Sequence, residues 1–352
     1  MQSDIQHRHR IFYKSLPKVE LHRHLEGSLR LSTMLEIARE YQLDMPFDAD
    51  KLRPMVQVQA GEPFSHQNFL SKFKTLRMFY QSPEVIQRIA REVVADAAAD
   101  NVRYMELRFT PMALAQIKDY PLAEAAGWAI DSVAQAAEDY GVQTRLIVSV
   151  NRHESVEIAA EAAQIAVDGM DKGVVALDLA GQEADFQAAP FLDLFKEARQ
   201  AGLHMTIHAG EWGGPENVIE AINVFQAERI GHGVRVTEDP EAVALAREQQ
   251  PTFEVCVTSN YQSGVVSSLE THPLPAMLES GLDVTINTDD PSLSQIDLSD
   301  EYELACENLG LSIEQLRECM LSAAEAAFLP DEKRTALVES LKAEFAEKNG
   351  KE

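Results

Sequence analysis

The sequence predicts an α/β protein of the (β/α)8 TIM barrel class, built as one domain over residues 1–352. Short apolar, β-branched runs recur along the chain, alanine- and glutamate-rich helical stretches separate most of them, and the runs number eight. Repeated strand-then-helix order indicates parallel strands with right-handed crossovers, and eight such units suggest a closed barrel. An open doubly wound sheet is the alternative, but no glycine-rich dinucleotide or Walker fingerprint follows the first strand.

The first predicted strand lies in the stretch 19–28, which follows Leu16-Pro17-Lys18 and stops at a glycine. Side chains alternate between the two faces of a strand, so His22 and His24 share one face while Arg23 points away. The other strands are predicted at Val102–Phe109, Thr144–Val150, Val174–Ala180, Leu203–Ala209, Arg229–Gly233, Phe253–Val257 and Asp283–Thr288. A second His-x-His pair, His7 and His9, lies in a polar N-terminal tail and is interpreted as solvated surface histidine.

An enlarged helical connection is predicted between the first two strands, over roughly residues 30–100. It begins with an amphipathic helix at residues 31–42, passes through a loop from Met45 to Pro63, and contains a second helical pattern at residues 69–76. Pro83 marks the start of a third helix. Later helices are predicted at Leu122–Glu138, Ser155–Asp168, Pro190–Ala201, Pro215–Ala227 and Asp239–Glu248, with extra C-terminal helices from Asp300 onward.

Composition narrows the classes of partner. The formal net charge of -26 argues against nucleic acid or an anionic membrane surface, because both would be repelled, and leaves a neutral small molecule open. Cys256, Cys306 and Cys319 are widely spaced, which favours a reducing compartment over a disulfide framework. The sequence has neither a signal peptide core nor a membrane-spanning apolar run, so a cytoplasmic protein is expected. It does not set the oligomeric state.

Polar residues gather at the carboxyl ends of the predicted strands, where barrels form their active sites. They are His22, His24 and Glu26 at the first strand, Asp178 and Gly181 at the fourth, His208 and Glu211 at the fifth, His232 at the sixth, Thr258-Ser259-Asn260 at the seventh, and Asn287-Thr288-Asp289-Asp290 at the eighth. Each has an ordinary structural explanation, such as a turn begun by aspartate. Their convergence on one mouth favours a functional site. Four other histidines do not lie among such groups of polar residues at strand ends and are interpreted as ordinary polar residues: His66, His153, His204 and His272.

Four of these side chains form a suitable ligand set for one Zn²⁺ per chain. His22, His24 and His208 offer imidazoles and Asp289 offers a carboxylate, which leaves room for water as a further ligand. A zinc ion lowers the pKa of bound water from about 15.7 to about 7, so hydroxide becomes available at neutral pH. The set therefore predicts hydrolytic attack on an electrophilic carbon.

Three further residues are candidates for proton transfer. Glu211 lies three residues beyond His208, where it can act as a general acid rather than as a ligand. His232 and Asp290 can orient the attacking water and take its proton. A binding module has no need of a proton donor beside its metal, so these residues argue against a non-catalytic zinc protein.

Seven segments, in order along most of the chain, resemble the motifs of the adenosine deaminase family, within the wider amidohydrolase group. They are residues 16–27 (LPKVELHRHLEG), 104–111 (YMELRFTP), 177–181 (LDLAG), 208–211 (HAGE), 229–233 (RIGHG), 258–260 (TSN) and 287–291 (NTDDP). The resemblance implies a zinc-bearing (β/α)8 barrel that hydrolyses the 6-amino group of a purine to a 6-oxo group and releases ammonia.

The resemblance also implies a role for each matching position. Glu211 would protonate the ring nitrogen beside the attacked carbon, His232 would stabilise the attacking hydroxide, and Asp290 would position it. The backbone amide of Gly181 would bond another ring nitrogen. The implied metal ligands are His22, His24, His208 and Asp289, and the further substrate contacts are His24, Glu26, Asp290 and an apolar lid of Phe69, Leu70 and Phe73. For the lid residues, core packing is the alternative.

Glu26 departs from the family pattern, because adenosine-specific members usually have aspartate there, bound to a sugar hydroxyl. Adenine deaminases and deaminases of modified adenine nucleosides, such as aminodeoxyfutalosine, can have glutamate and are alternatives. The segments 229–233 and 287–293 are closer to the nucleoside enzymes, so adenosine or deoxyadenosine is the predicted substrate. A two-metal ester or amide hydrolase is a further alternative, but those commonly carry a bridging lysine at the fourth strand, and Val174–Ala180 has none.

Overall fold

A computed structural model describes residues 2–349, and within them eight parallel strands form one sheet in sequence order. The strands are β1 (Lys18–His24), β2 (Val102–Phe109), β3 (Gln143–Asn151), β4 (Val174–Ala180), β5 (His204–Ala209), β6 (Arg229–His232), β7 (Thr252–Val255) and β8 (Asp283–Ile286). The sheet closes on itself through a parallel bridge between Arg23 and Asp289, just beyond β8. The predicted (β/α)8 barrel is confirmed.

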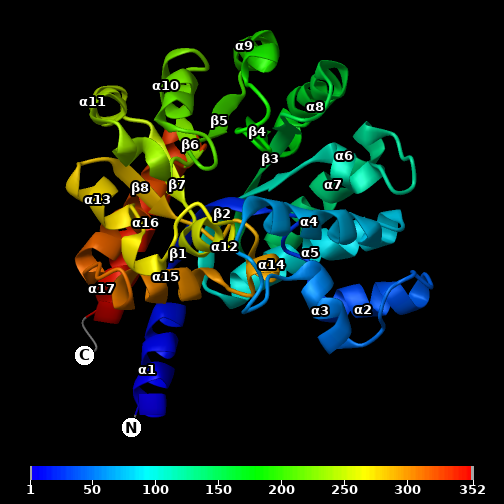
Figure 1. The fold of residues 1–352 in the computed structure, drawn as a ribbon, viewed down its shortest axis with the longest axis horizontal. Helices are drawn as coiled ribbons and strands as arrows, with labels where there is room; N and C mark the ends of the chain where they lie inside the picture. Colours follow the sequence, from blue (N-terminus) through cyan, green and yellow to red (C-terminus); the bar gives the residue numbers. More distant parts are fainter. Residues whose placement is uncertain (1, 350–352) are drawn as a thin grey trace.

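Helices surround the strands on all sides, as Figure 1 shows. Those of the first half are α1 (Gln2–Ser15), α2 (Leu31–Glu40), α3 (Ala49–Val56), α4 (His66–Leu76), α5 (Pro83–Ala99), α6 (Pro111–Ala115), α7 (Leu122–Tyr140), α8 (Val156–Asp168) and α9 (Leu192–Ala201). Those of the second half are α10 (Pro215–Asn223), α11 (Pro240–Gln249), α12 (Val257–Gln262), α13 (Leu274–Glu279), α14 (Pro291–Ser294), α15 (Leu298–Glu307), α16 (Ile313–Glu325) and α17 (Asp331–Asn349). Short 3₁₀ turns occur at Arg77–Phe79, Met170–Lys172, Ala189–Phe191, Val234–Glu238 and Leu269–Thr271.

The enlarged first connection consists of α2 to α5, and one detail of its prediction is wrong. The segment from Met45 to Pro63 is not a continuous loop, because its middle forms α3. Asp48 caps this helix by accepting a hydrogen bond from the Lys51 amide, and Leu52 and Val56 are buried. Proline and glycine punctuation obscured a short helix that tertiary burial stabilises.

One predicted strand end differs, and the N-terminal tail forms a helix for which the sequence made no prediction. The seventh strand ends at Val255, and the Thr258-Ser259-Asn260 segment lies on α12 rather than at a strand end. The N-terminal tail is helical, and Arg10 anchors it by binding Asp297 and Asp300 of the α15 region. His9 lies 3.4 Å from Glu307, whereas the His7 side chain lies outside the described residues.

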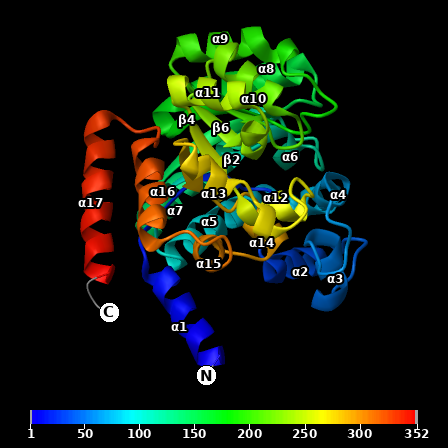
Figure 2. The same cartoon turned by 60° about the vertical axis from the view of Figure 1, so that its left-hand side comes forward.

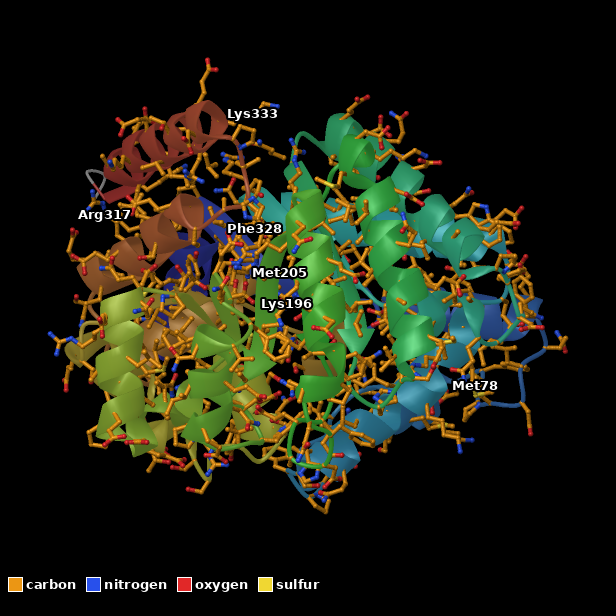
Figure 3. The ribbon with its side chains drawn as sticks, turned by 90° about the horizontal axis from the view of Figure 1, so that it is seen from above. Met78, Lys196, Met205, Arg317, Phe328 and Lys333 are labelled. Atoms are coloured by element: carbon orange, nitrogen blue, oxygen red, sulfur yellow. The ribbon has the colours of Figure 1, made fainter. Side chains whose placement is uncertain are left out.

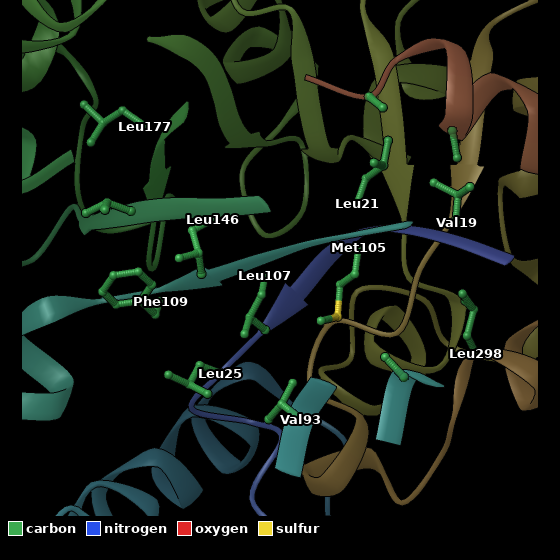
Figure 4. Packing of buried hydrophobic residues seen from close by; sticks show 14 of the residues in the cluster. Val19, Leu21, Leu25, Val93, Met105, Leu107, Phe109, Leu146, Leu177 and Leu298 are labelled. Carbon is green, nitrogen blue, oxygen red and sulfur yellow. The ribbon is translucent and has the colours of Figure 1, made fainter. Parts of the chain in front are cut away.

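The core lies between the strands and the helices that surround them. Along β2, Met105, Leu107 and Phe109 alternate with Glu106 and Arg108, and all five side chains are buried. Figure 4 shows part of the apolar layer, with residues of β1 and β2 beside residues of the surrounding helices. The other set of positions on β2 faces the barrel interior, so the interior carries buried charge. This polar interior supports the functional site.

The C-terminal helices α16 and α17 pack against each other along one side of the barrel (Figure 2). Figure 3 shows that this side, which carries Arg317 and Lys333, lies opposite Met78, which follows α4 in the first connection. Met78 lines the cavity described below. Between residues 2 and 349, no helix is long and apolar enough to cross a membrane.

Candidate active site

A cavity of about 860 Å³ opens at the carboxyl ends of the strands. The sequence-predicted residues that line it are His24, Glu26, Phe69, Leu70, Phe73, Gly181, His208, Glu211, His232, Asp289 and Asp290. His22 does not line the cavity: it is fully buried, and its ring centroid lies 4.7 Å from those of His208 and His232. The fold thus brings all the sequence-predicted site residues except His22 to the lining of one cavity.

Four imidazoles surround one carboxylate at the base of this cavity. Ligand atoms of His22, His208, His232 and Asp289 lie within 4.8 Å of one another. The Nε2 atom of His24 is 3.3 Å from Asp289 Oδ1, and so is the Nε2 atom of His22. The barrel closure creates this cluster, because the His24 amide donates to the Asp289 carbonyl at 2.8 Å and the Asp289 amide donates to the His22 carbonyl at 2.9 Å. The cluster contains one more imidazole, that of His232, than the predicted ligand set.

A divalent metal fits this cluster. The Nε2 atom of His22 is buried and makes no hydrogen bond to any described residue, and it faces a carboxylate oxygen. Burial lowers the pKa of His24 well below its usual value, so its imidazole is neutral and can offer a lone pair. Imidazole nitrogens and carboxylate oxygens are the donors that zinc takes in catalytic sites.

Two buried carboxylates orient the imidazoles from outside the cluster. Glu254 lies 2.8 Å from His22 Nδ1, and Asp178 lies 2.9 Å from His208 Nδ1. A carboxylate accepts the Nδ1 proton, which leaves the Nε2 lone pair free for a metal. Burial alone would raise the pKa of Asp178, but His208 and Arg108 hold it below its usual range. Such carboxylate–histidine pairs are typical of metal sites.

Arg108 joins these two pairs at the centre of the barrel. Its guanidinium is fully buried, 2.7 Å from Glu254 and 3.4 Å from Asp178, and it donates to the Leu21 carbonyl at 2.8 Å. Glu254 also lies 2.7 Å from Arg229. These cations keep both carboxylates ionised although each is buried.

The backbone is strained at two site residues. His232 has φ of 58° and Asp289 has φ of 64°, values in the left-handed region that residues other than glycine uncommonly adopt. Strain of this kind persists where the surrounding structure enforces it, and it clusters at functional sites. Gly27 adds a further constraint, because a Cβ atom there would lie 1.8 Å from an Asp290 carboxylate oxygen.

Glu211 is buried 3.6 Å from His232 Nε2. Burial, followed by the nearby charges of Asp289, Glu183 and Asp290, raises its pKa well above the usual range and so favours the protonated carboxyl. Glu183 fixes the backbone here by accepting from the Glu211 amide at 2.5 Å and the Gly210 amide at 3.0 Å. Because Glu183 follows Gly181 by two residues, it connects the β4 and β5 ends of the site.

Glu26 lines the cavity on the β1 side and accepts a hydrogen bond from the Thr110 amide at 2.6 Å. Its second oxygen is buried and makes no hydrogen bond to any residue that the structure describes. Burial raises the pKa of Glu26 to about 7, so both protonation states exist near neutral pH. The free oxygen can therefore accept from, or donate to, a substrate hydroxyl.

The remaining walls combine apolar and cationic groups. Phe69, Leu70 and Phe73 of α4 line the cavity, and Phe69 is also buried in the core, so core packing is shown for Phe69 and the lid role stays a prediction. Gly181 lines it with φ of 88°, a conformation that favours glycine. Three cationic or titratable side chains complete the wall: Lys74, Arg77 and His153. His153, interpreted from the sequence as an ordinary polar residue, therefore lies in the wall of the candidate active site.

Several residues of the site escaped the sequence reasoning. Arg108, Glu183 and Glu254 appeared as ordinary charged residues within a strand or loop. His272, interpreted as an ordinary polar residue, is buried 3.3 Å from Asn260, whose amide group lies 3.1 Å from His232. The alternation of charged and apolar residues in Tyr104–Phe109 was the available signal, since charge at alternate positions of a central strand indicates a polar barrel interior.

Comparison with known proteins agrees with this geometry. The adenosine deaminase family model matches residues 17–344, and an adenosine deaminase of Klebsiella pneumoniae is 40% identical over 92% of this chain and 97% of its own. The chain belongs to the adenosine deaminase family. It is therefore a hydrolytic deaminase with the amidohydrolase fold.

Solved structures of the family's fold superpose closely on this chain. A cog1816 amidohydrolase of Burkholderia ambifaria with bound Zn is 28% identical, has a TM-score of 0.88, and is matched over 97% of this chain and 93% of its own. An adenine deaminase of Arthrobacter aurescens is also 28% identical, with a TM-score of 0.86 over 93% of this chain and 98% of its own. The relatives and the His/Asp cluster together indicate a metal site in this family member.

Proposed function

We propose that this chain hydrolyses the 6-amino group of adenosine and 2′-deoxyadenosine, giving inosine or 2′-deoxyinosine and ammonia. The observation that carries the proposal is the buried Glu211 carboxyl, whose pKa is raised by burial, beside the imidazole–carboxylate cluster at the base of a cavity that accommodates a nucleoside. The named relative of Klebsiella pneumoniae supports adenosine as the substrate. A small-molecule substrate also agrees with the strongly negative chain, which disfavours nucleic acid and anionic membranes.

We assign one Zn²⁺ per chain to the side chains of His22, His24, His208 and Asp289. Zinc at this position would lower the pKa of a coordinated water to about 7 and so supply hydroxide at neutral pH. The Zn-bound Burkholderia structure supports zinc over other divalent ions. Ser259 supports Asp289 by donating to its Oδ2 atom at 2.7 Å.

Residues of this chain transfer the protons and hold the purine in place. Glu211 donates its proton to the ring nitrogen beside the attacked carbon, which makes that carbon electrophilic, and the Gly181 amide donates to another ring nitrogen. Asp290, whose Oδ1 atom is buried without a hydrogen bond to a described residue, accepts from the attacking water and aligns it. His232 stabilises the attacking oxygen. The phenyl rings of Phe69 and Phe73, with Leu70, cover the purine and exclude bulk water.

A substrate panel tests this proposal. We expect zinc-loaded protein to deaminate adenosine and 2′-deoxyadenosine with a kcat/KM at least ~10-fold above that for adenine, AMP or aminodeoxyfutalosine, because Glu26 binds the sugar hydroxyl. The fall in ultraviolet absorbance at the adenine band measures turnover, and metal analysis counts zinc. Adenine as the best substrate would favour the activity named for the Arthrobacter relative, whereas AMP as the best substrate would favour a role for Lys74 and Arg77. Two zinc equivalents, both needed for turnover, would contradict the single-metal assignment.

The length of the Glu26 side chain is expected to set the preference between purines. Glu26→Asp shortens the carboxylate by one methylene, which weakens the bond from Thr110 and moves the free oxygen relative to the sugar. We expect KM for adenosine to change by ~10-fold or more while KM for adenine changes little, because adenine has no sugar hydroxyl to lose. Parallel KM measurements on both substrates check this. Equal changes on both would show that Glu26 supports the fold of the cavity rather than the sugar.

A further inference from the structure

A chain of three hydrogen bonds runs from the start of helix α13 into the active site. The Leu274 amide donates to His272 Nδ1 at 3.1 Å, His272 Nε2 lies 3.3 Å from Asn260 Oδ1, and Asn260 Nδ2 lies 3.1 Å from His232 Nδ1. Asn260 and His232 are almost completely buried, and His272 is 4% exposed. None of these side chains can exchange its partners for bulk water.

The Leu274 N–H, at one end of this series of hydrogen bonds, fixes which group donates and which accepts in each bond. A backbone N–H can only donate, and the Leu274 N–H is one of the donors that α13 leaves unpaired at its first turn. His272 Nδ1 must therefore accept, so the single proton of the neutral ring is on Nε2. Burial lowers the pKa of His272 to about 3, which keeps the ring neutral.

The protonated Nε2 of His272 in turn fixes how the Asn260 side chain is oriented. Its Oδ1 atom accepts the His272 Nε2 proton, which fixes the orientation of the amide group and turns its NH₂ group toward His232. An amide NH₂ group can only donate, so His232 Nδ1 must accept and carries no proton. A neutral His232 then has its proton on Nε2, the atom that faces Glu211 and Asp289.

We propose that Asn260 and His272 are positioning residues that hold His232 as the Nε2–H tautomer. His232 then acts as a hydrogen-bond donor to the attacking oxygen and does not ligate the metal. This inference depends on the proposed function in one respect only: that the hydrogen bond donated by His232 goes to the oxygen that attacks the purine. It also explains why His232 differs from two of the other clustered imidazoles: Glu254 and Asp178 accept from Nδ1 of His22 and His208, which gives those two rings the opposite tautomer, with Nε2 free as a ligand.

The tautomer can be read directly by NMR. Full-length protein carrying ¹⁵N-histidine, free of metal, is observed by long-range ¹H–¹⁵N correlation, and the His232 signals are assigned by their loss in His232→Gln. We expect Nε2 of His232 to be protonated and Nδ1 to be unprotonated. A protonated Nδ1 on His232 in this spectrum would overturn the proposal. The spectrum does not depend on the substrate, so failure to deaminate adenosine would refute the proposed function alone.

Asn260→Asp reverses the donor and acceptor in the hydrogen bond to His232 Nδ1 with almost no change in the shape of the side chain. A carboxylate can only accept, so His232 Nδ1 becomes the donor and Nε2 loses its proton. We expect the spectrum to show a protonated Nδ1, and kcat to fall at least ~100-fold with a KM change below ~3-fold, as for loss of a donor to the reacting oxygen. Asn308→Asp, the same change at an exposed site on the far end of α15, is the matched control and should change neither.

A pair of His272 variants separates positioning from general stability. His272→Phe removes the donor that orients the Asn260 amide, so we expect both His232 tautomers to appear and kcat to fall. His272→Gln keeps an N–H donor for Asn260 and should restore the single Nε2–H tautomer and most of the activity. An unchanged His232 spectrum in both Asn260→Asp and His272→Phe would overturn the proposal. Should Asn260→Asp not fold, the wild-type spectrum and the His272 pair decide the question.

Discussion

Glu211→Gln is expected to lower kcat for adenosine by at least ~100-fold while the protein keeps its zinc, because the variant has the same shape but no acidic proton to donate. The structure gives Glu211 a buried carboxyl with a raised pKa, two backbone bonds that fix its loop, and a position beside the cluster rather than in it. Loss of the donor should therefore affect the chemical step and leave the metal site intact.

Steady-state kinetics with metal analysis on the same samples measures both halves of this expectation. Glu161→Gln on the exposed face of α8 is the matched control and should retain wild-type kinetics. Near wild-type turnover by Glu211→Gln would remove Glu211 from the role of general acid. Loss of zinc together with activity would instead place Glu211 among the metal ligands.

Arg108→Met is expected to lower the free energy of unfolding by about 3–5 kcal/mol, the usual result when a buried ion pair loses one partner. Methionine fills much of the same volume but leaves Glu254 and Asp178 with less compensation for their buried charge. Because those carboxylates orient His22 and His208, we also expect metal affinity to fall by about 10–100-fold.

Urea unfolding and a competitive zinc titration test the two parts separately. Arg317→Met is the matched control, since Arg317 pairs with Glu314 on one exposed helix turn, where an ion pair contributes at most about 1 kcal/mol. Equal destabilisation by the two substitutions would show that the Arg108 network does not stabilise the barrel. Unchanged zinc affinity in Arg108→Met would show that the carboxylate–histidine pairs hold their geometry without it.

The sequence by itself determined the barrel, because alternating strand and helix patterns depend on local periodicity that a single chain displays. It also placed His22, His24, His208 and Asp289 at one mouth, since parallel strands of a closed barrel direct their carboxyl ends to the same side. The family resemblance is confirmed, and the roles assigned to individual residues stay predictions.

Only the tertiary structure decided which residues support those side chains. Arg108 lies 146 residues before its partner Glu254, whereas Asn260 and His272 lie 12 residues apart, and in neither pair does the spacing along the chain reveal the contact. The segment 258–260 also changed from a strand end to the helix α12, which directs Asn260 toward His232. Periodicity reports which face of an element is buried, whereas the partner of a buried polar group depends on long-range packing. That packing decides which nitrogen of each histidine holds a proton.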